Sequence, residues 1–247
     1  MNTSPKGTRL SRIGCWTAGI GVALIAFSAV RKLGIVDNWM IAYSALGLGG
    51  LMLMIALLTA GLGLIRSGGT AGAASRQGTW LALVAGLLVT AFNLNSMRSM
   101  GGPPIHDITT DTVNPPMFVD AIPLREADKS MNPPSYFAAE VAPQQLAAYP
   151  DLTTIVIQKP ADEVYQKAID VANAMGWEII STVRADGRIE ATAETPWIAF
   201  RDDVVIRVIN FGTETRVDVR SKSRVGRGDA GLNARRIREF RERLTAA

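Results

Sequence analysis

The only histidine of the chain lies beside residues that could take part in catalysis. His106 is followed directly by Asp107 and, a few residues later, by Asp111. Histidine titrates near pH ~6.5, and a neighbouring carboxylate can orient its ring for general acid–base work. The alternative is structural, because both aspartates are good turn formers. One histidine without a nearby cysteine supplies a single nitrogen ligand, so we expect no metal site.

A second candidate site is the basic stretch after the last predicted strand. Its members are Arg220, Ser221, Lys222, Ser223, Arg224 and Arg227. A helix is predicted to begin near residue 229, and free N–H groups at a helix N-terminus favour anions. These residues therefore predict a site for a phosphate, a lipid headgroup or an acidic glycan.

Two features oppose that interpretation of the basic stretch. The cations could instead pair across the sheet with Glu190, Glu194, Asp202, Asp203 and Asp218. Asp229 would also repel an anion if its carboxylate capped the helix. Structural pairing and anion binding therefore both remain open at this point.

Trp197 and Phe200 lie in a predicted strand connection just before Asp202 and Asp203. They could form an apolar lip beside a ligand, or they could plug the core. The sequence contains no glycine-rich phosphate loop, nucleophile elbow or cluster of metal ligands, and we expect no cofactor.

Three apolar stretches precede these residues and predict transmembrane helices at about 13–30, 39–65 and 79–95. The second has no charged residue in 27 positions. A helix of that length spans ~40 Å, more than the ~30 Å hydrocarbon core. The three stretches contain no ionisable residue that would mark a transport pathway, apart from the thiol of Cys15 and the phenol of Tyr43.

The flanking charges predict the orientation of this membrane domain, residues 1–98. Five Lys/Arg flank the N-terminal side and the 66–78 loop, against three on the opposite side. The positive-inside rule then places the N-terminus in the cytoplasm and residues after 98 in the periplasm. Glycines and alanines in the second span predict close helix packing within one chain; a homo-oligomer is possible but not indicated.

The remainder of the chain divides by composition. Residues 99–150 contain nine prolines and predict an extended tether without long helices. Residues 151–247 hold sixteen basic and fifteen acidic residues. A domain so close to neutrality excludes a primary nucleic-acid-binding role.

Residues 151–247 predict a β-α-β-β-β-β-α domain of the α+β class. Apolar and polar residues alternate at 153–158, 177–183, 188–195, 204–209 and 215–221. Apolar residues recur at helical spacing at about 162–175 and 230–244. We expect one antiparallel sheet with both helices on its apolar face and a polar opposite face.

Several segments resemble a known family. They are 104–111 (PIHDITTD), 114–116, 149–151, 189–193 (IEATA), 202–207 (DDVVIR), 220–226 (RSKSRVG) and 229–237. The region 103–244 is similar to the family called domain of unknown function 1499. The resemblance implies a domain found in bacterial envelope proteins and, by the family's name, no assigned activity.

These observations favour a multi-pass protein of the bacterial inner membrane. Its periplasmic domain is expected to bind an envelope protein or an anionic lipid or glycan. The alternative is a membrane-tethered enzyme that uses His106 with Asp107 or Asp111.

Overall fold

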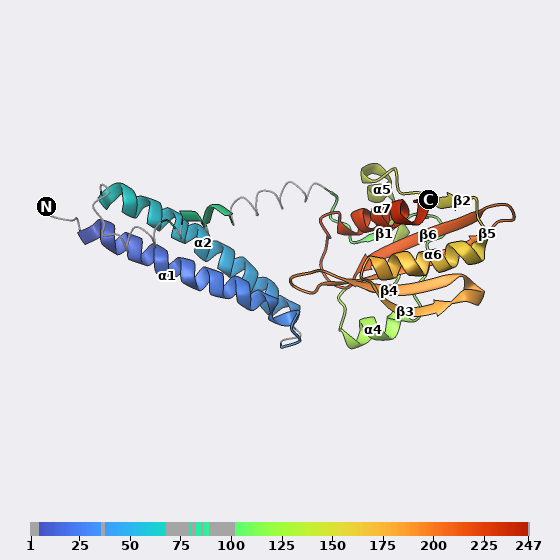
Figure 1. Ribbon diagram of the computed structural model, residues 1–247, viewed down its shortest axis with the longest axis horizontal. Helices are drawn as coiled ribbons and strands as arrows, with labels where there is room; N and C mark the ends of the chain where they lie inside the picture. The colour runs from blue at the N-terminus through green and yellow to red at the C-terminus, as the bar shows by residue number, and fades with distance from the viewer. Residues whose placement is uncertain are drawn as a thin grey trace. The chain divides into compact units, whose positions relative to one another are not determined.

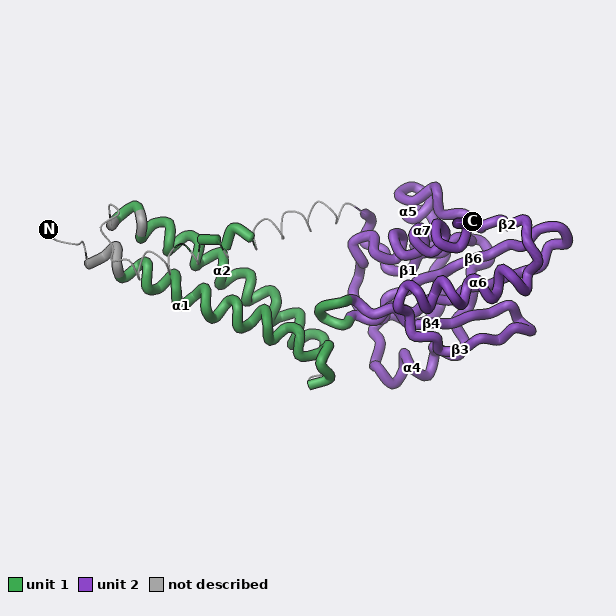
Figure 2. Tube along the Cα trace, viewed as in Figure 1, with its two compact units in different colours: residues 1–98, 196–199 green, residues 99–195, 200–247 purple. Residues whose placement is uncertain are grey.

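The computed structural model describes residues 5–35, 38–67, 80, 83–84, 86–88 and 102–246. The chain separates into two compact units, which are residues 1–98 with 196–199 and residues 99–195 with 200–247 (Figure 2). Each unit is described by itself.

The first unit contains two long helices, α1 (Pro5–Ser28) and α2 (Trp39–Ser67), with a short 3-10 turn at Ala29–Arg31. The stretches Arg9–Arg31 and Trp39–Gly63 are long and apolar enough to cross a membrane. Helices at the first two predicted spans are therefore confirmed. The third predicted span, 79–95, lies mostly outside the described residues, although residues 80, 83–84 and 86–88 are helical.

Small residues bring α1 and α2 into backbone contact. A Cβ placed on Gly49 would lie 2.8 Å from the Gly21 carbonyl oxygen, and one on Gly14 would lie 3.1 Å from the Ala60 backbone nitrogen. A Cβ on Gly86 would meet the Leu57 Cβ at 2.7 Å. Glycines thus pack against neighbouring helices within the chain, since only glycine allows these approaches, while a homo-oligomer stays a prediction.

The outward surfaces of α1 and α2 are apolar. Trp16 is 75% exposed, Leu58 is 65% exposed and Ile65 is 78% exposed. Exposed apolar area costs roughly 25 cal/mol per Å² in water. The helix pair therefore has the surface expected of helices that contact lipid.

The second unit is an α+β domain built on one six-stranded antiparallel sheet (Figure 1). Its strands are β1 (Asp107–Thr109), β2 (Ile155–Ile157), β3 (Glu178–Val183), β4 (Arg188–Glu194), β5 (Arg201–Asn210) and β6 (Thr215–Ser223). The strand order is β1-β6-β5-β4-β3, and β2 also pairs with β6. A 3-10 turn at Arg184–Asp186 connects β3 and β4.

The main core lies between this sheet and the helices α6 (Ala161–Ala174) and α7 (Leu232–Thr245). Ile189, Ile206 and Val219 are fully buried on the sheet side. Trp177 stacks on Phe240 of α7 at 5.5 Å between ring centroids. The predicted strand and helix order of residues 151–247, and the predicted apolar face, are confirmed.

The predicted extended tether is wrong for most of its length. Residues 102–150 contain β1, the helix α4 (Ala121–Ala127) and the helix α5 (Ala138–Ala148). These helices are only seven and eleven residues long, and each contains a proline, but the segment belongs to the domain. β1 pairs with β6, a partner more than one hundred residues away, and nothing local in the sequence indicates that pairing.

Residues 113–137, here called the cover, lie over the polar face of the sheet. The Glu190 carboxylate accepts hydrogen bonds from the backbone N–H groups of Val119 and Ala121 at 2.9 and 2.8 Å. Phe118 packs beside Val205 of β5. The face is polar, as predicted, but it is buried, because the cover excludes solvent from it.

Candidate functional site

The strand β6 divides the predicted anion site between two faces of the sheet. Side chains alternate along a strand, so Arg220 and Lys222 point to the cover while Ser221 and Ser223 point to α7. All four side chains are buried. The sequence therefore grouped residues that the sheet separates.

Arg220 and Lys222 share one carboxylate, that of Asp107 in β1. The Arg220 Nε and Nη2 atoms lie 2.8 Å from the two Asp107 oxygens, and the Lys222 Nζ lies 2.9 Å from Oδ2. All three side chains are at most 1% exposed. A fork-shaped pair of this kind combines charge with fixed geometry.

The cover completes the surroundings of the two cations. Arg220 donates to the carbonyl oxygens of Pro134 and Pro116 at 2.8 and 3.3 Å, and Lys222 donates to that of Ser135 at 2.7 Å. The Arg220 guanidinium also lies 4.9 Å from the Phe118 ring centroid. Burial lowers the pKa of Lys222, and the charge of Asp107 opposes that shift.

A second ion cluster surrounds Asp203 of β5. Its carboxylate accepts hydrogen bonds from Arg224, including one of 2.7 Å from Nη2, and from Arg125 of α4 at 2.5 Å. Arg224 also reaches Asp128 at 3.1 Å. Like Arg220 and Lys222, Arg224 thus contacts carboxylates of its own chain.

The two serines belong to a polar cluster under the N-terminal end of α7. The Ser221 hydroxyl lies 2.6 Å from the Asn233 Oδ1, and the Asn233 Nδ2 donates to the Ser223 hydroxyl at 3.0 Å. Arg236 donates to Ser221 at 2.9 Å and to Asp202 at 2.6 Å.

The N-terminal end of α7 is capped by Asp229. Its carboxylate accepts hydrogen bonds from the backbone N–H groups of Gly231 and Asn233 at 2.8 and 2.7 Å. Burial raises the pKa of Asp229, although these hydrogen bonds oppose the shift. Two of the N–H groups that would attract an anion are therefore bonded to a carboxylate of the same chain, and the Leu232 N–H donates to the Asp229 carbonyl oxygen at 3.1 Å. Of the six predicted anion-site residues, Arg227 alone is exposed.

The His106 ring is not hydrogen-bonded to either of the two predicted carboxylates, Asp107 and Asp111. Its Nδ1 lies 3.3 Å from the Arg227 carbonyl oxygen. Burial lowers the pKa of His106, and the positive charge of Lys222 adds to that effect. Asp107 is bound to the buried cations, and Asp111 bonds Arg207 at 3.0 Å. No group of three metal-ligating side chains occurs among the described residues.

The predicted aromatic lip lies in the connection between β4 and β5. Trp197 is 49% exposed, while Phe200 is half-buried and donates its backbone N–H to the Thr195 hydroxyl at 2.8 Å. The two carboxylates after it, Asp202 and Asp203, contact arginines on opposite faces of the sheet.

The profile of the family described as "Protein of unknown function (DUF1499)" matches residues 107–244. The match covers more than half of the chain and begins at the carboxylate that binds Arg220 and Lys222. The chain belongs to the DUF1499 family. No curated protein sequence matches it significantly.

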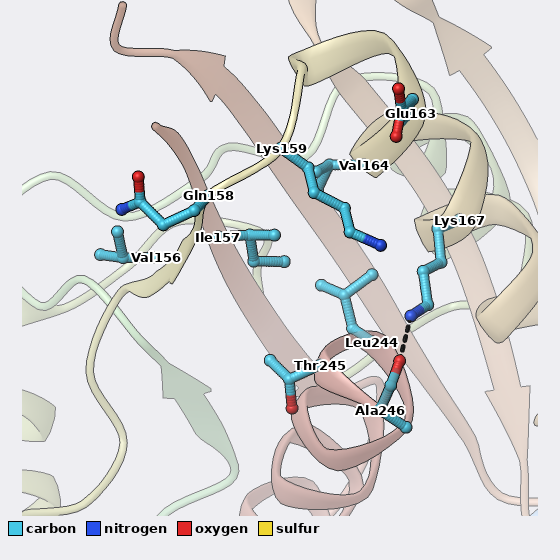
Figure 3. Close-up of a pocket in the computed structure, with 10 residues that line it drawn as sticks. All are labelled: Val156, Ile157, Gln158, Lys159, Glu163, Val164, Lys167, Leu244, Thr245 and Ala246. Carbon is cyan, nitrogen blue, oxygen red and sulfur yellow. Dashed lines mark hydrogen bonds between the residues drawn. The ribbon is translucent and has the colours of Figure 1, made fainter. Parts of the chain in front are cut away.

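The DUF1499 domain also contains a groove that the sequence analysis missed. The groove has a volume of about 450 Å³ and lies between β2, the start of α6 and the end of α7 (Figure 3). Ile157, Val164 and Leu244 supply apolar side chains, and Lys159 and Lys167 supply charge. Lys159 precedes α6 and Lys167 lies within it, so no regular spacing in the sequence marked these two lysines as neighbours.

Gln145 of the DUF1499 domain is a second residue that the sequence analysis missed. Its side-chain amide accepts from the Thr109 N–H at 3.0 Å and donates to the Thr109 carbonyl at 2.6 Å. Gln145 is fully buried. No sequence signal marks it, because its role depends on where β1 lies.

Proposed function

We propose that this protein is a multi-pass protein of the bacterial inner membrane whose DUF1499 domain is a periplasmic recognition domain for another envelope protein. The apolar outer surface of α1 and α2 carries this proposal. A pair of helices with Trp16, Leu58 and Ile65 exposed is stable in lipid and costly in water.

The orientation rests on the flanking charges and on a third span at 79–95. The N-terminal side carries five Lys/Arg against three on the other side. Three crossings place the domain on the side opposite the N-terminus, which is the periplasm if the N-terminus is cytoplasmic.

A protein partner is favoured over an anionic lipid or glycan by the contacts of the basic residues. Arg220, Lys222 and Arg224 are buried and form ion pairs with carboxylates of the domain. Their side chains are therefore not available to bind an external anion. The enzyme alternative receives no support from the geometry around His106, because Asp107 and Asp111 bind other cations.

Reporter fusions test the location. Alkaline phosphatase is active only outside the cytoplasm, so we expect activity for fusions after Arg98 and after Ala247 and none for a fusion within the 66–78 loop. Phosphatase activity in the 66–78 loop alone would overturn the orientation. Recovery of the full-length chain in the soluble fraction after carbonate washing would overturn the membrane anchor.

A further inference from the structure

We propose that the outer edge of β2 and the groove beside it bind an extended peptide that has an apolar side chain next to a carboxylate. This inference rests on the proposed role as a recognition domain, and it names the site and the chemistry of the partner.

Two strands share the outer edge of the sheet, and one of them is closed. β1 and β2 pair with successive parts of β6, at Arg220–Lys222 and Thr215–Val217. The outward N–H and C=O groups of Thr109 in β1 are both bonded by the Gln145 side chain. This part of the edge cannot accept a further strand.

The β2 part of the edge is open. Residues 219 and 223 of β6 direct their backbone groups to this side, as the Thr110 N–H to Val219 carbonyl bond of 2.9 Å shows. Alternation then points Val217 and Thr215 toward β2, where they face Ile155 and Ile157. The N–H and C=O of Val156 consequently point outward, and no described residue bonds them. Val156 is 49% exposed.

The groove next to this open edge has an apolar floor and a positive rim. Ile157, Val164 and Leu244 form the floor (Figure 3). The ammonium groups of Lys159 and Lys167 extend over it, whereas the Glu163 carboxylate points away. Lys167 donates to the Ala246 carbonyl, and neither lysine forms an ion pair with a described residue.

These features match one mode of peptide recognition. An added strand gains backbone hydrogen bonds from an open edge, and alternate side chains enter neighbouring pockets. Here one apolar side chain would fill the groove while a carboxylate reaches the two ammonium groups. A second copy of this chain fits less well, because pairing β2 with β2 would bring like charges together.

Fluorescence anisotropy with the full-length protein in dodecyl maltoside micelles tests the site. The probe is a labelled hexapeptide of alternating threonine and valine that ends in leucine with a free carboxylate. Saturable binding is expected, with about tenfold weaker binding of the amidated peptide. A third, amidated peptide that ends in glutamate separates a side-chain carboxylate from a terminal one. Equal affinity for all three peptides, or binding of none, would overturn the proposal.

Val156→Pro tests the backbone contact directly. Proline removes the outward N–H but leaves the bonds between β2 and β6, and sheets tolerate it on an edge. We expect binding to weaken about tenfold, whereas the matched control Val156→Thr keeps the N–H and the affinity. Unchanged binding by a Val156→Pro variant with a wild-type melting temperature would exclude strand addition.

The double variant Lys159→Glu/Lys167→Glu tests the charge. The free-acid peptide should lose at least about tenfold in affinity, and the double variant Lys129→Glu/Arg227→Glu, at two exposed sites elsewhere in the domain, is the control for net charge. If both variants weakened binding equally, the groove would not be the site. Membrane fractionation and reporter activity of the same variants should match wild type, so failure here leaves the proposed membrane location standing.

Discussion

The helix pair and the DUF1499 domain place their polar and apolar groups in opposite ways. In α1 and α2 most of the buried positions are glycines and alanines, Leu53 being a buried exception, and many large apolar side chains face outward. In the domain, a layer of charged groups such as Asp107, Arg220 and Lys222 lies fully buried.

The difference shows that the two regions are stabilised by different interactions, close backbone packing in the helix pair and apolar burial in the domain. Lipid offers no hydrophobic driving force between helices, so in a membrane α1 and α2 would depend on close backbone packing. Water drives the apolar core of the domain together, and the same burial makes unpaired charges costly. The charged layer is therefore sensitive to loss of a single partner, and four experiments test this contrast.

The largest effect is expected for Asp107→Ala. It leaves Arg220 and Lys222 buried without their shared carboxylate, which should lower the free energy of unfolding by about 3–5 kcal/mol. Chemical denaturation of the protein in micelles, followed by near-ultraviolet circular dichroism, to which the core residue Trp177 contributes, measures it. Asp151→Ala breaks an exposed pair with Arg238 and should cost below about 1 kcal/mol. Similar losses of unfolding free energy in the two variants would show that the buried charged layer is no more sensitive to loss of a partner than the surface is.

In the helix pair, Gly49→Leu should destabilise by about 1–3 kcal/mol or more, because any side chain there meets the Gly21 carbonyl and the Ile25 backbone. Gly47→Leu is the matched control, since nothing lies within 4 Å of a Cβ at that glycine. The midpoint of SDS-induced unfolding, read by far-ultraviolet circular dichroism, compares them. Equal midpoints would mean that α1 and α2 do not pack through Gly49.

Gln145→Ala should cost about 1–3 kcal/mol, because it leaves the Thr109 N–H and carbonyl buried and unpaired. Amide exchange at Thr109 should become faster, which measures opening of the β1 edge. Gln144→Ala is the neighbouring control and loses only an exposed bond within α5. Unchanged exchange at Thr109 in the Gln145 variant would refute the edge-closing role.

The smallest effect concerns His106. Its pKa is lowered from 6.5 in the folded domain by burial, so the unfolded chain binds a proton more readily. Stability should therefore fall as the pH drops below about 6.5, toward the lower pKa of the folded state. His106→Gln should show a shallower decline in melting temperature between pH 7.5 and pH 5.5. A steeper decline in the variant would reverse the sign of this linkage.

Local pattern was enough to predict much of the domain. The alternation at 188–195 and 215–221 predicted β4 and β6, because period-two patterning reports which face of a strand is apolar. Helical spacing of Val164, Ala168 and Val171 predicted α6. These signals lie within a few residues of one another, so a single sequence contains them.

The contacts of Asp107 and Gln145 were not predictable in this way. Asp107 meets Arg220 and Lys222 across more than one hundred residues, and Gln145 acts on a strand that is too short to show a period. Prolines in 99–150 indicated an extended tether, whereas the carbonyls of Pro116 and Pro134 accept hydrogen bonds from Arg220. A residue's type shows that it can bond, and the fold selects its partner.

The sequence by itself determined where apolar helices form, the strands and helices of residues 151–247 with their apolar face, and the family to which the domain belongs. Only the tertiary structure decided that the basic residues of β6 are buried against Asp107 and Asp203, and that one part of the sheet edge is closed while the other is open. The physical reason is the separation along the chain of the residues that interact. Periodicity involves residues a few positions apart, whereas a buried charge needs a counter-charge that can lie anywhere in the sequence.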